Sequence, residues 1–109
     1  MSKPDTPLWS TLTEPFLVRP GVSRSTMMGY PCLRLDGDFF ASWDPHHEQL
    51  IVKLDQPTAT ALIDAGRAEP FAPSGRRFRE WIAVPVARQR SWRRFLDDAF
   101  DHAVARRGT

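Results

Sequence analysis

The side chains best suited to binding a ligand are arginines in the second half of the sequence. Residues 67–109 contain ten arginines and five acidic residues, whereas residues 1–66 contain five basic and eight acidic residues. Arginine pairs with phosphate through parallel hydrogen bonds and stacks on flat rings, so arginines near a Trp or Phe are typical of nucleic-acid contacts. The candidate nucleic-acid-binding residues are Arg76, Arg77, Arg79, Arg88 and Arg90.

A solvated protein surface is the alternative explanation for these arginines. Arg93 and Arg94 stand four residues before Asp97 and Asp98, which is the spacing of ion pairs on an exposed helix. Each such pair is worth about 0.2–0.5 kcal/mol. Cations at the start of a helix also oppose its dipole, which is mildly unfavourable. The sequence is compatible both with a nucleic-acid contact and with a solvated surface.

A second candidate site is a pocket formed by Tyr30, Lys53 and Trp81, which would belong to an enzyme of unknown reaction. The hypothesis requires that the three side chains converge and that their surroundings perturb the lysine.

The other residue types that often carry chemistry lack partners at a useful spacing. His46 and His47 are adjacent in a predicted turn and cannot easily converge on one ion, whereas zinc needs three or four ligands. Cys32 has no neighbour expected to lower its pKa. Three aspartates fall at predicted turns, where Asp bonds to nearby backbone: Asp36, Asp38 and Asp44. No glycine-rich phosphate loop occurs, so no catalytic residue, metal or cofactor is predicted.

The size and composition of the chain fit a single globular domain. Its 109 residues include seven Phe and four Trp, enough apolar surface for a core. We expect one domain over 1–109, with flexible ends at 1–7 and 106–109. A single cysteine fits a reducing compartment, and no apolar stretch approaches the roughly 18 residues that span a membrane. The expected location is cytoplasmic, without a membrane partner.

Alternating apolar residues predict a series of strands. Asp36-Gly37 is a strong hairpin signal, because both central residues of a type I′ turn need positive φ. A later strand over 81–86 would close at Pro85, which suits a strand end. The earlier strands are expected over 22–28, 31–35, 39–44 and 50–54.

Three helices are expected around these strands. The first, over 8–18, is short or broken because Pro15 lies inside it. The second is capped by Asp55 or Gln56, has Pro57 in its first turn and ends at Gly66. The last begins after Ser91 and carries one apolar stripe: Trp92, Phe95, Leu96, Ala99, Phe100, Ala103 and Val104. The order predicts a two-layer α+β fold, with an antiparallel sheet (a meander plus a further strand) and helices packed on one face.

Segments in this order also resemble a known family. They are Val22, Met27-Met28-Gly29-Tyr30, Leu35-Asp36-Gly37-Asp38-Phe39-Phe40, Leu50-Ile51-Val52-Lys53-Leu54, Ala65-Gly66, Glu69-Pro70-Phe71, Trp81-Ile82-Ala83-Val84-Pro85 and Trp92. Their order and spacing over about residues 8–105 resemble the TfoX N-terminal domain group, close to the MmcQ/YjbR proteins. The resemblance implies the two-layer fold shared with secretion chaperones. The founding TfoX proteins are competence regulators, and DNA binding has been proposed for YjbR-like members.

Three functions therefore stay open. The first is a non-enzymatic binding or regulatory module of the TfoX N-terminal type. The second is a nucleic-acid binder that uses the arginines, and the third is an enzyme that uses the pocket. An exposed apolar patch involving Phe40 or Trp43 would instead favour an unknown protein partner or a homodimer.

Overall fold

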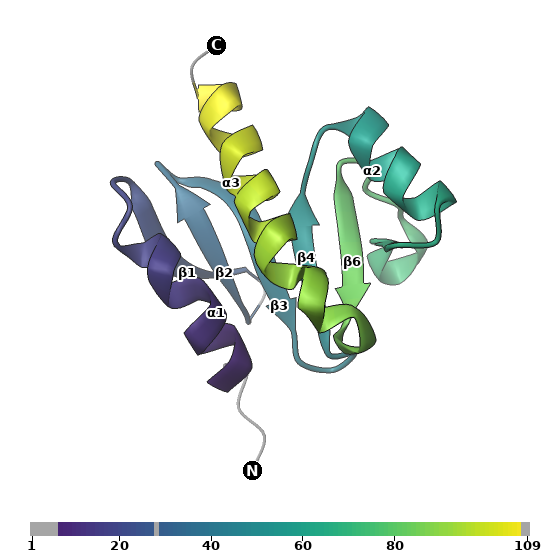
Figure 1. The fold of residues 1–109 in the computed structure, drawn as a ribbon, viewed down its shortest axis with the longest axis horizontal. Helices are drawn as coiled ribbons and strands as arrows, with labels where there is room; N and C mark the ends of the chain where they lie inside the picture. The colour runs from purple at the N-terminus through teal and green to yellow at the C-terminus, as the bar shows by residue number, and fades with distance from the viewer. Residues whose placement is uncertain (1–6, 28, 108–109) are drawn as a thin grey trace.

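In the computed structural model, residues 7–27 and 29–107 are described (Figure 1). The helices are α1 (Pro7–Leu17), α2 (Gln56–Asp64) and α3 (Trp92–Arg107), with short 3-10 helices η1 (Pro73–Gly75) and η2 (Val86–Ser91). The strands are β1 (Val22–Met27), β2 (Tyr30–Leu35), β3 (Asp38–Asp44), β4 (Gln49–Lys53), β5 (Glu69–Pro70) and β6 (Trp81–Pro85). Position 28, where the first predicted strand ends, and the outermost residues of both predicted flexible ends lie outside the described residues.

The strands of the described chain form one antiparallel sheet of six strands. Their order is β1-β2-β3-β4-β6-β5. The first four strands pair consecutively and form the predicted meander, while β6 is the further strand and pairs with β4. The two-residue β5 pairs with β6 at the edge of the sheet. The predicted α+β class with an antiparallel sheet is confirmed.

The two faces of the sheet are different. Cross-strand partners share a face, and the row Leu33, Ala41, Val52 and Ile82 belongs to one hydrophobic core with residues of all three helices. The adjacent row faces the other way: Cys32, Ser42, Ile51 and Ala83. In Figure 1, α1 and α3 lie across the same face of the sheet, and α2 lies beside β6. We call the face that carries Cys32 and Ile51 the open face.

A bulge in β3 places Phe40 on the same, helix-covered face as Ala41, so that Phe39 points to the other face. Leu33 pairs with Ala41 but Arg34 pairs with Phe39, so Phe40 is an extra residue in β3. Phe40 is fully buried against Phe100 of α3, with ring centroids 5.9 Å apart. Phe39 therefore shares the open face with Arg34, whose guanidinium lies 4.3 Å from the centre of its ring.

Local signals in the sequence produce the turns and caps that they predict. Asp36 and Gly37 have φ of 50° and 87°, as the hairpin requires. The carboxylate of Asp55 accepts a hydrogen bond from the N–H of Thr58 at 3.1 Å and caps α2. Gly66 follows α2 with a φ of 74°, which a residue without a Cβ adopts at little cost.

The first helix is short and unbroken, although it contains Pro15. Proline removes the hydrogen bond that its N–H would give to the carbonyl of Thr11. Only two residues of α1 follow, so the loss is confined to the last turn. The buried hydroxyl of Thr13 donates to the carbonyl of Trp9 at 2.9 Å, which satisfies that polar group inside the core.

Ion pairs fix the end of α3 to the β2–β3 hairpin. Nη2 of Arg106 lies 2.6 Å from Oδ2 of Asp38, and Arg107 pairs with Asp36. Arg106 and Arg107, which belong to the end expected to be flexible, form the last two residues of α3. Sequence reasoning missed the ion pairs because the two arginines and the two aspartates are far apart in the chain.

Candidate functional site

Strand pairing places Lys53 beside Trp81 on the open face. Lys53 is the last residue of β4 and the direct cross-strand partner of Trp81, the first residue of β6. The Lys53 ammonium nitrogen lies 6.0 Å from the centre of the Trp81 ring, at the limit of a cation–π contact. Two members of the predicted pocket are therefore neighbours.

The segment before β6 adds two further rings and a cation. Phe71 packs against Phe78 and Trp81, with ring centroids 5.9 and 6.4 Å apart. Backbone hydrogen bonds from Phe78 to Phe71 (2.9 Å) and from Trp81 to Phe78 (3.0 Å) hold this segment in place. The guanidinium of Arg76 lies 5.3 Å from the centre of the Phe78 ring. Three rings thus form a cluster with a cation at each end, Arg76 beside Phe78 and Lys53 beside Trp81.

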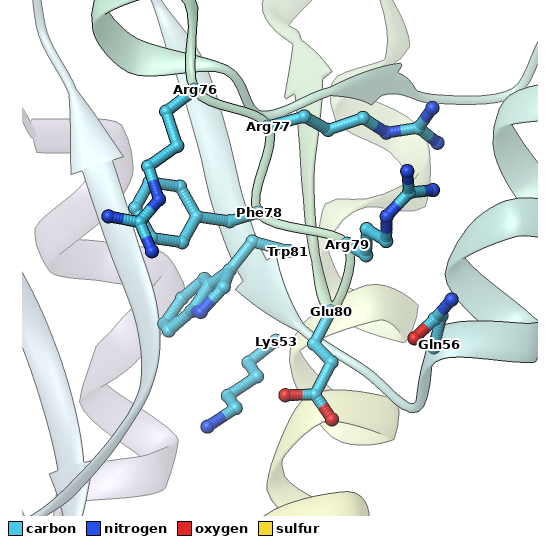
Figure 2. Close-up of a pocket in the computed structure, with 8 residues that line it drawn as sticks. All are labelled: Lys53, Gln56, Arg76, Arg77, Phe78, Arg79, Glu80 and Trp81. Atoms are coloured by element: carbon cyan, nitrogen blue, oxygen red, sulfur yellow. The ribbon is translucent and has the colours of Figure 1, made fainter.

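These side chains line a cleft of about 480 Å³, which we call the arginine cleft. Its lining residues are Lys53, Gln56, Arg76, Arg77, Phe78, Arg79, Glu80 and Trp81. Figure 2 shows Arg76 lying over Phe78, with Trp81 next to that ring. Arg77 and Arg79 extend instead toward the side on which Gln56 lies. Four cations and one carboxylate make the cleft strongly basic.

Only three of the five predicted arginines belong to this cleft. Arg76, Arg77 and Arg79 precede Trp81, whereas Arg88 and Arg90 lie in η2, beyond Pro85. β6 runs five residues between the two groups, a length of about 17 Å at 3.4 Å per residue. The structure therefore divides the predicted binding residues between opposite ends of β6.

Tyr30 lies away from Lys53 and Trp81. It begins β2, and its ring makes an edge contact with His46 in the β3–β4 turn, with centroids 6.0 Å apart. That turn is at the opposite end of β4 from Lys53. The predicted pocket of three converging residues is therefore wrong, which removes the geometry that the enzyme hypothesis required.

No family model, curated protein or solved structure matches this chain. Within the described ranges, no helix is long and apolar enough to cross a membrane. The case for a function therefore depends on the site itself.

The remaining candidate residues have local structural roles. Oδ1 of Asp44 accepts hydrogen bonds from the backbone N–H groups of His46 and His47, and its Oδ2 lies 2.8 Å from Nδ1 of His47. Cys32 is buried, and this burial raises the pKa of its thiol. Among the described residues, no group of three or more His, Cys, Asp or Glu could hold a metal ion.

A second hollow of about 430 Å³ lies between α2 and α3 and has the opposite charge. Its lining residues are Leu54, Asp55, Thr58, Asp98, Asp101 and His102. Burial lowers the pKa of His102, and the nearby Arg106 lowers it further, so the imidazole is neutral at neutral pH. Three carboxylates there repel an anionic ligand, while the arginine cleft attracts it.

Sequence reasoning missed the rings of Phe71 and Phe78. Both fall in a stretch without a regular period, so neither strand nor helix patterning singles them out. Their association depends on the chain turning back at η1, which brings them together with Trp81. The available signal was a phenylalanine flanked by arginines on both sides: Arg76, Arg77 and Arg79 surround Phe78.

Proposed function

We propose that this protein is a non-enzymatic binding module of the TfoX N-terminal type and that its ligand is nucleic acid, held in the arginine cleft. The observation that carries the proposal is that Lys53, Arg76, Arg77 and Arg79 line one cleft together with the exposed ring of Phe78 and the half-buried ring of Trp81. Guanidinium groups pair with phosphate oxygens, and rings stack on bases.

The positions of the charges support an anionic ligand. Arg76, Arg77 and Arg79 are all exposed, and none of them makes an ion pair within the described residues. By contrast, Arg93 pairs with Asp97 at 3.9 Å, and Arg106 and Arg107 pair with aspartates. Arginines without an internal partner gain most from an external phosphate.

A protein partner that docks on an apolar patch at Phe40 or Trp43 has less support. Phe40 is 0% exposed and Trp43 is 3% exposed. Trp43 packs edge-on against Trp92, with centroids 5.4 Å apart. Neither ring is available at the surface, so the patch that would favour a homodimer or another protein does not form there.

The test is a fluorescence titration with labelled mixed-sequence DNA at about 50 and 200 mM salt. Binding should weaken steeply with salt because each phosphate contact releases counterions. The variant Arg76→Ala/Arg77→Ala/Arg79→Ala should bind more weakly, with a log–log salt slope smaller by about 2 to 3.

The matched control is Arg88→Ala/Arg90→Ala/Arg94→Ala, which removes the same charge from exposed positions outside the cleft. This control should keep most of the wild-type slope. Absence of binding at the lower salt would refute the proposal. Equal losses in both triple variants would show that overall charge, rather than the cleft, attracts the DNA.

A further inference from the structure

The arginine cleft continues into a row of cations and rings across the open face. Arg34 pairs with Phe39 and Lys53 pairs with Trp81. These four side chains all lie on the open face, near the end of the sheet that carries the cleft. Arg34, Phe39, Lys53 and Trp81 are half-buried, so part of each side chain is accessible to solvent. The row thus alternates cation and ring from β2 to β6.

The dimensions of this row fit an extended chain of nucleotides. Three strand spacings separate β2 from β6, because β3 and β4 lie between them. At about 4.8 Å per spacing, the row extends about 14 Å before it reaches Phe78 and Arg76. A path of this length offers several rings to successive bases.

The side chains beside the row are mostly small and are buried beneath their neighbours. Cys32, Ser42 and Ala83 form most of the adjacent buried row. Beyond it the face becomes polar, where Nε2 of Gln49 donates to Oε1 of Glu69 at 3.1 Å. Positive charge and rings are therefore concentrated along one side of the open face.

We propose that this row, together with the arginine cleft, binds single-stranded nucleic acid, with unpaired bases stacked on Phe39, Trp81 and Phe78. The inference rests on the proposed function and narrows it to one class of ligand. Rings on a sheet face reach the flat side of a base only when that base is unpaired, whereas a duplex presents its phosphates and groove edges. Cations between the rings neutralise the connecting phosphates.

The test compares three fluorescein-labelled DNA ligands by anisotropy at about 50 mM salt. They are a 12-nucleotide oligo(dT), the corresponding 12-base-pair duplex, and an oligomer of the same length made of abasic sites. The abasic oligomer keeps the phosphates but offers nothing to stack. Oligo(dT) should bind about tenfold more tightly than the abasic oligomer, since each stacked base adds substantially to affinity, and more tightly than the duplex.

Ring variants locate the contacts. Phe78 is 37% exposed, and Phe78→Leu should weaken oligo(dT) binding about tenfold while leaving abasic binding unchanged. Phe39→Leu should act in the same direction, because it removes a ring at the far end of the row. The matched control is Tyr30→Leu, which removes a ring beside the β3–β4 turn and should leave both affinities unchanged. Thermal melts confirm that each variant is folded.

The outcomes separate this inference from the proposed function. Equal affinity for oligo(dT) and the abasic oligomer, or tighter binding of the duplex, would overturn base stacking while leaving phosphate binding in the cleft intact. Absence of binding to all three ligands would overturn both proposals. Loss of oligo(dT) binding in Tyr30→Leu equal to that in Phe78→Leu would place the stacking surface elsewhere.

Discussion

Single charges in the arginine cleft can be tested one residue at a time. Glu80 is exposed and is the acidic member of the cleft lining. Figure 2 shows its carboxylate on the same side of the cleft as the Lys53 ammonium group. A carboxylate in this position repels a bound phosphate and offsets part of the attraction from the cations.

Replacement of Glu80 by Gln should therefore tighten DNA binding. We expect a gain of about two- to fivefold at 50 mM salt and a smaller gain at 200 mM, because salt screens exposed charges. Anisotropy titration measures both values. Asp64→Asn is the control, since Asp64 is exposed at the end of α2 and lies outside the cleft. Unchanged or weaker binding in Glu80→Gln would contradict the proposed position of the phosphates.

At the scale of elements, the hollow between α2 and α3 contains a histidine that should make stability sensitive to pH. His102 lies on α3, facing the hollow that it shares with Asp55 and Thr58. Burial and then Arg106 lower its pKa below the usual 6.5, while Asp55, Glu80 and Lys53 make smaller contributions of both signs. In the unfolded chain the histidine regains its usual pKa and binds a proton more readily than in the folded protein.

The free energy of unfolding should therefore fall as the pH decreases through 6.5 toward the lower folded pKa, and should change little from this group above 6.5. Urea unfolding at a series of pH values between about 5 and 8 measures this dependence. His102→Gln should flatten the curve in that range. The control His46→Gln changes an exposed turn residue and should keep the wild-type slope. A pH dependence that survives in His102→Gln would contradict this account.

Element-scale features were also the most predictable from sequence. The hairpin at Asp36-Gly37, the Asp55 cap and the stop at Gly66 each depend on a few adjacent residues, so local chemistry determines them. The two-residue β5 was missed because it is too short for a periodic signal and contains Pro70. The continuity of α1 through Pro15 depends on how few residues follow the proline.

The candidate site was less predictable, because it depends on which elements become neighbours. Lys53 and Trp81 meet because β6 pairs with β4. Arg88 lies at the other end of β6 from Arg76, because the strand runs between them in the chain. Phe39 reaches the open face through the bulge at Phe40, which alternation alone does not reveal.

At the scale of the whole molecule, the helices and the proposed binding row lie on opposite faces of one sheet. The covered face supplies the hydrophobic core, in which the largest side chains include Trp9, Phe16 and Trp92. The open face carries rings and cations that are not part of the hydrophobic core.

We propose that nucleic-acid bases reach the open face at Trp81. Of the four tryptophans, Trp9, Trp43 and Trp92 are at most 3% exposed, whereas Trp81 is only half-buried. The most direct measurement is a titration of intrinsic tryptophan fluorescence with unlabelled oligo(dT), comparing the wild type with Trp81→Phe. Stacking should quench part of the wild-type emission, and Trp81→Phe should lose that quenching while still binding labelled oligo(dT). Unchanged emission in the wild type at saturating DNA, or equal quenching in Trp81→Phe, would contradict the account.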